Sequence, residues 1–299
     1  MASAAAAGVP RTEHGRRRPP TGDAVSAGEN APSAEKARWV CERLDAAYGI
    51  LTWRSHGEPL GTLVMTILSQ NTSDTNSERA FDSLRRRFPT WDAVRDAPVA
   101  DIADAIRCGG LADAKAPRIQ AVLREIHRRN HGAAPIDLDF LRDLPTPAAK
   151  EYLNSFHGVG PKTTACVLMF SLGRPVLPVD THVFRVSHRL GLIPQRLGEA
   201  KAHDALQAML PDDRVYPFHV HMIRHGRRVC TAQRPRCGAC VLRERCDFFR
   251  GSAVATDGGA VPPPSRNPSG RVESLHGFRP EAPTFGDGEA AGTPAQSTP

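Results

Sequence analysis

A lysine and an aspartate lie close together in this sequence, beside a glycine-rich turn, and the two could carry out nucleophilic chemistry. Lys162 ends the run 156–162 (FHGVGPK), and Asp180 lies in the run 179–182 (VDTH). A lysine amine that has lost its proton attacks electrophilic carbon, and a nearby carboxylate stabilises positive charge that develops in the substrate. Lys162 could also serve as a plain cation for a bound anion, so two roles are open.

The turn before Lys162 has the composition of an anion site. Gly158 and Gly160 flank a single valine, and glycine inside a regular helix costs free energy, so the backbone is expected to turn there. Pro161 suits the first turn of a new helix, because its missing N–H is not needed at that position. The free amides at such a helix start bind anions, usually phosphate.

Lysine is rare in this chain, which bears on the role of Lys162. Lysine and arginine together number 39, and only five of these are lysine: Lys36, Lys115, Lys150, Lys162 and Lys201. Arginine serves a phosphate contact well but cannot be deprotonated in a protein, whereas a partly desolvated lysine can. A lysine at this turn therefore favours the nucleophile.

Four of the seven cysteines form a second candidate site. Cys230, Cys237, Cys240 and Cys246 have the spacing C-x6-C-x2-C-x5-C, and four thiols this close in a cytosolic protein indicate a metal site. The spacing fits a zinc ion or a [4Fe–4S] cluster. The other three cysteines lie on mostly apolar helical faces and are predicted core residues.

The 299 residues and the net charge of +7 are unevenly distributed. Residues 1–34 and 251–299 have few large apolar side chains and no periodicity, which predicts two disordered tails. These tails together carry seven arginines and eight acidic residues, so residues 35–250 carry about +8. A cationic folded part favours an anionic polymer as partner, although a solvated charged surface has the same composition.

Hydropathy argues against a membrane protein. No apolar run reaches the roughly 18 residues that span a bilayer, and the N-terminus lacks the apolar segment of a signal peptide. We therefore expect a cytoplasmic protein, associated with the nucleoid if its partner is DNA.

Apolar periodicity predicts an all-α protein. The clearest amphipathic helix places Leu60, Leu63, Val64, Ile67 and Leu68 on one face. No run alternates with period two for more than a few residues. The predicted helices span 34–48, 60–68, 73–88, 91–96, 99–107, 115–130, 137–143, 146–155, 161–172, 181–190, 198–210 and 216–228.

Two corners between these helices carry side chains that a simple turn does not require. Gln70 follows the apolar helix 60–68 at a position that does not suit a helix cap. Leu111 lies between two glycines and a polar turn. Such a leucine packs against its neighbours or acts as an apolar wedge that enters a base stack.

Three separated motifs resemble the endonuclease III family of helix-hairpin-helix DNA glycosylases. They are the run 158–162 (GVGPK), the run 179–186 (VDTHVFRV) and the cysteine loop, and the run 68–74 (LSQNTSD) resembles the glutamine-containing corner of that family. The motifs occur in the family's order across residues 35–250.

The resemblance implies two helical lobes with DNA across the cleft between them. A six-helix lobe would comprise residues 55–172, and residues 35–54 plus 173–250 would form the second lobe. In this family the cysteine loop of the second lobe binds a [4Fe–4S] cluster, so the resemblance favours iron over zinc.

The resemblance also implies roles for the residues of the first site. Lys162 would attack the sugar C1′ of a flipped-out nucleotide in damaged double-stranded DNA, displace an oxidised pyrimidine, and cut the strand by β-elimination through a Schiff base. Asp180 would stabilise the cationic sugar. We expect the protein to act as a monomer. The implied DNA contacts are Gln70 and Leu111, which fill the vacated place, and Gly158, Gly160, His182, Arg234 and Arg236.

The chain departs from the family pattern at two places. Phe156 and His157 stand where the family usually has Leu-Pro, and residues 136–155 form a longer connection before the hairpin. One alternative is a glycosylase that removes a mismatched base without cutting the strand; in the adenine enzymes the helix before the glutamine corner carries a catalytic glutamate, which helix 60–68 lacks. A DNA-binding module without activity would need neither Lys162 nor Asp180.

Overall fold

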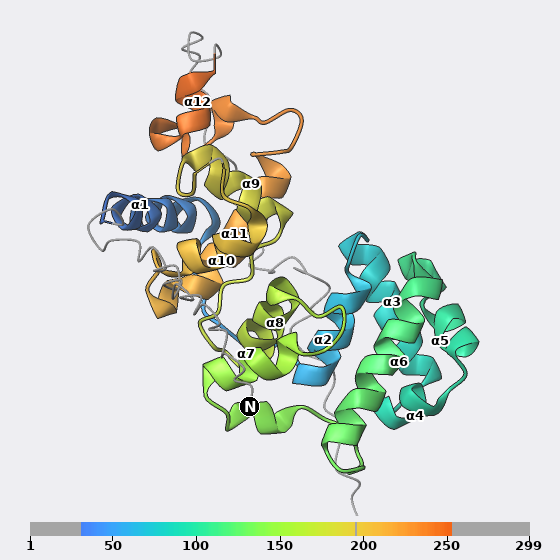
Figure 1. Ribbon diagram of the computed structural model, residues 1–299. Helices are drawn as coiled ribbons and strands as arrows, with labels where there is room; N and C mark the ends of the chain where they lie inside the picture. The colour runs from blue at the N-terminus through green and yellow to red at the C-terminus, as the bar shows by residue number, and fades with distance from the viewer. Residues whose placement is uncertain (1–30, 195, 253–299) are drawn as a thin grey trace, which may run out of the picture.

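The computed structural model of the protein describes residues 31–194 and 196–252. As the sequence predicted, every regular element in these ranges is helical, and no strand occurs there (Figure 1). The helices are α1 (Ala31–Tyr48), α2 (Pro59–Leu68), α3 (Asp74–Arg87), α4 (Trp91–Asp96), α5 (Val99–Ile106), α6 (Ala112–Arg129), α7 (Thr146–Asn154), α8 (Pro161–Cys166), α9 (Thr181–Leu190), α10 (Glu199–Gln207), α11 (Asp212–Arg228) and α12 (Asp247–Gly251).

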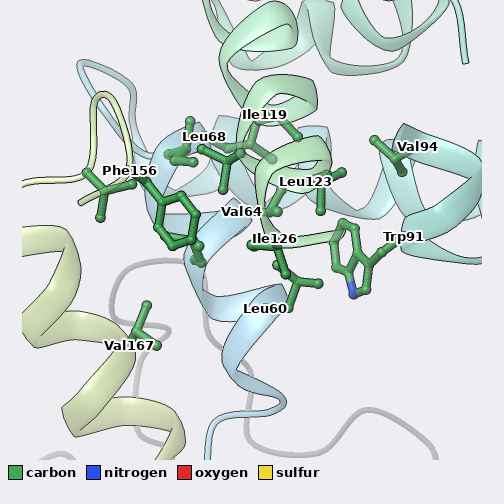
Figure 2. Close-up of a cluster of buried hydrophobic side chains, with 14 of the residues drawn as sticks. Leu60, Val64, Leu68, Trp91, Val94, Ile119, Leu123, Ile126, Phe156 and Val167 are labelled. Atoms are coloured by element: carbon green, nitrogen blue, oxygen red, sulfur yellow. The ribbon is translucent and has the colours of Figure 1, made fainter. Parts of the chain in front are cut away.

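Helix α2 is the centre of a first hydrophobic core. All ten of its residues are buried, and none of them is charged. A helix that is apolar all round must be surrounded by other elements. Figure 2 shows its Leu60, Val64 and Leu68 among side chains of α4, α6 and the hairpin region: Trp91, Val94, Ile119, Leu123, Ile126, Phe156 and Val167. The range 55–172 holds α2 to α8, one helix more than the six expected.

A second hydrophobic core lies between α1, α9, α10 and α11. Figure 1 shows these helices grouped with α12, apart from α3 to α6. Helix α8 links the two cores because it continues into the π-helical segment Val167–Ser171. Val167 belongs to the first core, and Phe170 belongs to the second. The helix that begins next to Lys162 is therefore anchored in both.

Three helices begin three or four residues earlier than predicted. Helix α1 starts at Ala31, so the last residues of the expected tail 1–34 are helical. Helices α6 and α11 start at Ala112 and Asp212 and contain Pro117 and Pro217 in their interiors. Proline is common in the first turn of a helix. The predicted starts at residues 115 and 216 place each proline in a first turn, whereas both helices begin about one turn earlier.

Other parts of the expected organisation lie outside the described residues or differ from it. Residues 1–30 and 253–299, which make up most of the two expected tails, are not among the described residues. The short helix α12 had not been predicted. Residues 136–155 contribute Ile136, Leu138 and Leu141 to the first core and contain α7, so this connection is packed into the molecule. Within the described ranges, no helix is both long and apolar enough to cross a membrane.

Candidate active site

The turn between α7 and α8 is held by the packing of two apolar side chains. Phe156 and Val159 are 3% and 4% exposed, and the Val159 amide donates to the Phe156 carbonyl at 3.1 Å. Phe156 therefore anchors the turn in the first core. His157 next to it is exposed at the tip of the turn.

The two glycines of the turn differ in whether the fold requires them. Gly158 has φ +79°, a conformation that side chains rarely adopt, and a Cβ there would lie 2.8 Å from Nε of Arg118. Gly160 has an extended backbone and is the N-cap of α8, with open space where a Cβ would stand. Neither strain nor crowding demands glycine at position 160, so this position leaves room for a closely approaching ligand.

Lys162 is the second residue of α8 and is half-buried. One helical turn further on lies Cys166, which is fully buried. Burial raises the pKa of the Cys166 thiol, and the charge of the nearby Lys162 amine opposes that change. The Lys162 amine thus lies against the Cys166 side chain, at the junction of the two cores.

Asp180 is the N-cap of α9. Its Oδ1 accepts a hydrogen bond of 2.7 Å from the backbone N–H of Val183. The Asp180 carboxylate also raises the pKa of both Cys166 and His219, whereas the Lys162 charge lowers both. The structure therefore brings Lys162 and Asp180 around the same two buried side chains, although 17 residues separate them in the sequence.

His219 of α11 supports this region and had no role assigned from the sequence. It is fully buried, and burial lowers its pKa to about 4. Its Nδ1 donates to the carbonyl of Pro178 at 2.8 Å, because a carbonyl only accepts. Pro178 stands two residues before Asp180, so α11 fixes the segment that delivers the carboxylate. The sequence gives no signal for this contact, because His219 and Pro178 lie 41 positions apart.

The histidines of α11 do not form a metal site. His221 Nε2 lies 3.2 Å from Asp45 Oδ1, and His225 Nδ1 lies 2.9 Å from the Tyr48 hydroxyl. No group of three or more His, Cys, Asp or Glu side chains in residues 31–194 and 196–252 is placed to hold a single metal ion. The three rings therefore serve packing and hydrogen bonding.

The two corners lie next to each other in the structure. The Thr72 hydroxyl, in the corner that carries Gln70, donates to the carbonyl of Gly109 in the other corner. Leu111 has φ 54°, and its side chain is 57% exposed. A leucine with this backbone conformation costs about 1–2 kcal/mol, so an exposed leucine held there is better explained by a contact with a partner than by packing.

The four cysteines of the C-terminal loop line one cavity together with Val229 and Phe249. Burial is the main cause that raises the pKa of Cys240 to about 12, and the three other cysteines of the loop contribute to the same rise. Four cysteine side chains around one cavity form a donor set that fits an iron–sulfur cluster as well as a zinc ion.

The remaining predicted contacts lie on the surface near these sites. Arg234 and Arg236 are exposed on the cysteine loop, whose path is fixed by a 2.8 Å bond from the Arg236 amide to the Val229 carbonyl. His182 lies two residues after Asp180, and its Nδ1 is 3.1 Å from Nη2 of Arg185. Burial lowers the pKa of His182, which favours its neutral form.

Comparisons with known proteins agree with this arrangement. Residues 64–211 match the HhH-GPD superfamily of base excision DNA repair proteins. Residues 230–246, which begin and end on the outer two cysteines, match the iron–sulfur binding domain of endonuclease III.

Three similar proteins illustrate the match. Endonuclease III of Thermotoga maritima is 36% identical over 199 residues, which are 66% of this chain and 87% of that protein. DNA glycosylase/AP lyase ROS1 of Arabidopsis thaliana is 36% identical over 189 residues, 58% of this chain but 13% of that protein. A trapped endonuclease III–DNA covalent intermediate has a TM-score of 0.61 and 27% identity, covering 73% of this chain and 97% of the solved one. The chain spans 57% of another relative, an Arabidopsis thaliana protein assigned as a DNA glycosylase.

Proposed function

Since this chain belongs to the endonuclease III family, within the HhH-GPD superfamily of base excision DNA repair proteins, we propose that it is a bifunctional DNA glycosylase. It excises oxidised pyrimidines from double-stranded DNA and then cuts the strand at the abasic site. The observation that carries this proposal is the placement of Lys162 in the first turn of α8, directly after the glycine-rich hairpin, and of Asp180 as the N-cap of α9.

The chemistry assigned to Lys162 is nucleophilic substitution at the sugar. The lone pair of the neutral amine forms a bond to C1′ while the glycosidic bond breaks, and the bonding electrons leave with the base. The sugar ring then opens to give a protonated Schiff base on Lys162. Loss of a C2′ proton expels the 3′ phosphate by β-elimination, so the strand is cut 3′ of the lesion. The position of Lys162 beside the buried, neutral Cys166 thiol supports this role.

Asp180 stabilises the positive charge that develops on the sugar as the base leaves. Its hydrogen bond to the Val183 amide holds one carboxylate oxygen, and the bond from His219 to Pro178 holds the segment before it. A fixed carboxylate needs no reorganisation during the reaction, which is the advantage of electrostatic preorganisation.

In this proposal DNA lies across the boundary between two lobes, which comprise residues 55–172 and residues 35–54 plus 173–250. The amides of Gly158 and Gly160 bind a phosphate, and the open space beside Gly160 supports this contact. Gln70 and Leu111 fill the place of the flipped nucleotide. The net charge of +8 on the folded part supports a polyanionic partner, with His182, Arg234 and Arg236 as further contacts.

The four loop cysteines hold the [4Fe–4S] cluster that the family match implies. A bound cluster supplies a cross-link that fixes the path of the loop carrying Arg234 and Arg236. The buried thiols and the guanidinium of Arg189, whose Nη1 lies 3.4 Å from Sγ of Cys230, provide the donor set and a compensating charge.

A substrate panel tests this proposal against a monofunctional mismatch glycosylase. Duplexes carrying thymine glycol, an abasic site or a mismatch are incubated with the protein, and released base and strand breaks are measured separately. The proposal expects base release from thymine glycol together with strand cleavage. Base release from a mismatch alone, with the strand left intact, would refute it.

A further inference from the structure

A buried lysine joins the two corners. Lys115 of α6 is 3% exposed, and its Nζ donates to the Leu68 carbonyl at 2.6 Å, to the Thr72 hydroxyl at 3.1 Å and to the Gly109 carbonyl at 3.2 Å. The first two partners belong to the Gln70 corner, and the third belongs to the Leu111 corner. One ammonium group therefore satisfies all three of its protons on backbone and hydroxyl oxygens of both corners.

A charge in this position is costly for stability alone. Desolvation lowers the pKa of Lys115, and the nearby charge of Arg118 adds to that effect. Burying an ammonium without a carboxylate partner is usually unfavourable relative to an apolar side chain of similar size. The buried charge of Lys115 is therefore better explained by the contacts of its ammonium group, which fix the two corners relative to each other.

A second cation of the same helix reaches the side chain of Gln70. Nη1 of Arg118 donates to Oε1 of Gln70 at 2.7 Å. The same arginine lies against the hairpin, since a Cβ placed at Gly158 would be 2.8 Å from its Nε and 2.9 Å from its Cδ. Arg118 therefore touches both the corner that carries Gln70 and the turn that precedes Lys162.

We propose that Lys115 and Arg118 are positioning residues that hold Gln70 and Leu111 together as one unit before DNA binds. Helix α6 carries the unit, because Leu111 is its N-cap and both cations lie in its first two turns. Neither cation touches the reacting atoms. The inference rests on the proposed function in one respect, that Gln70 and Leu111 enter the duplex at a flipped nucleotide.

The physical gain is preorganisation. A free glutamine side chain on a corner samples several rotamers, and ordering it on binding costs conformational entropy. Because Arg118 already holds Oε1 of Gln70 in the free protein, the side chain is ordered before DNA binds and this entropy is not lost on binding. Arg118 then acts on DNA only through Gln70, and this distinguishes it from an arginine that contacts a phosphate directly.

A double-mutant cycle on a non-reactive duplex tests the proposal. The duplex carries a tetrahydrofuran abasic analogue opposite 2-aminopurine, so no excision or Schiff-base chemistry is involved, and the fluorescence of 2-aminopurine reports insertion of the corners. Affinity and fluorescence change are measured for the full-length protein with its cluster, for Arg118→Met, for Gln70→Ala and for the double variant. The matched control is Arg124→Met, which removes an exposed arginine of the same helix.

Arg118→Met is expected to weaken binding by up to ~10-fold, the scale of the cost of ordering one side chain on binding, and to reduce the fluorescence change. In the Gln70→Ala background the same substitution should have no further effect, because residues that act through one another are not additive. The salt dependence of binding should keep its slope, whereas loss of a phosphate contact lowers that slope by about one. Three results would overturn the proposal. They are a double variant whose loss of affinity is the product of the two single losses, a smaller slope of the salt dependence for Arg118→Met, or an effect of Arg118→Met no larger than that of Arg124→Met.

Lys115 is tested by Lys115→Met, with urea unfolding and the visible absorbance of the cluster as checks of folding. If the variant folds, binding should weaken and the fluorescence change should fall together; unchanged values of both would contradict the role of Lys115. If the Lys115 variant does not fold, the double-mutant cycle of Arg118 and Gln70 tests the proposal by itself. Because the analogue cannot react, a positive cycle together with absent base excision would reject the proposed activity and retain the positioning roles.

Discussion

Oδ1 of Asp180 accepts a hydrogen bond of 2.7 Å from the backbone N–H of Val183, so the proposed catalytic carboxylate is also the N-cap of α9. The local structure of the helix thereby sets the position and orientation of the side chain. Asparagine caps a helix about as well as aspartate does. Replacing Asp180 with asparagine therefore removes the charge and keeps the helix cap.

Asp180→Asn should therefore lose base excision while the protein keeps its stability. We expect the single-turnover excision rate to fall by ~100-fold or more, the scale of one removed electrostatic stabiliser, with the free energy of unfolding changed by less than about 0.5 kcal/mol. Asp180→Ala should in addition lose about 1 kcal/mol of stability. Excision kinetics and urea unfolding measure the two effects. An Asn variant that excises as fast as the natural protein would exclude Asp180 from the chemistry.

Leu111→Gly should separate function from stability at the second corner. Leu111 has φ 54° and is 57% exposed, so glycine relieves strain of about 1 kcal/mol and loses little packing. We expect unchanged or higher stability, together with ~10-fold weaker binding to an abasic-site duplex because the apolar wedge is gone. Val99→Ala removes part of another exposed apolar side chain and serves as the control. Unchanged affinity of the Leu111 variant would contradict the wedge.

The stability of the protein should decrease as the pH falls, because the buried His219 is held in its neutral form. Burial lowers the pKa of His219 to about 4, below the ordinary value of about 6.5. The unfolded chain therefore binds a proton that the folded chain does not, so the contribution is complete above about pH 6.5 and is lost as the pH falls toward 4. Between pH 7.5 and 5.5 this single residue accounts for about 1 kcal/mol. Urea unfolding of the natural protein and of His219→Asn, with cluster absorbance monitored, should show a shallower pH dependence in the variant; equal slopes would contradict it.

The cysteine loop should contain iron. The protein is expected to be brown, with about four iron atoms per chain and no stoichiometric zinc. Cys237→Ala should lose the visible absorbance and make residues 230–246 more sensitive to protease, because the thiolates are no longer held together. Cys41→Ala, in the second core, should retain the colour and is the control. Colourless protein with one zinc per chain would refute the assignment.

The elements around the site could be predicted because local signals specified them. The apolar run of α2, the proline at the start of α8 and the glycines of the hairpin each appear within a few neighbouring residues. The early starts of α6 and α11 could not be predicted, since the prolines in their interiors imitate a helix start. The π-helical segment Val167–Ser171 was also missed because its apolar residues fit a regular helix equally well.

Contacts between segments that lie far apart in the sequence could not be predicted from it. His219 and Pro178 are joined across two elements, and Lys115 and Arg118 bind a corner that lies 47 and 48 positions away in the sequence. In the sequence these residues looked like ordinary members of amphipathic helices. Their roles follow from packing, which places one helix face against loops that sequence periodicity does not position.

Borohydride trapping on an abasic-site duplex tests the central claim, that Lys162 is a nucleophile, most directly. Reduction of the Schiff base should give a covalent protein–DNA adduct with the natural protein and with Lys201→Ala, an exposed lysine of α10. Lys162→Ala and Lys162→Arg should give none, and the arginine variant should still bind the duplex, because arginine keeps the charge but cannot be deprotonated. An adduct of undiminished yield with Lys162→Arg would contradict the account and leave Lys162 as a phosphate-binding cation.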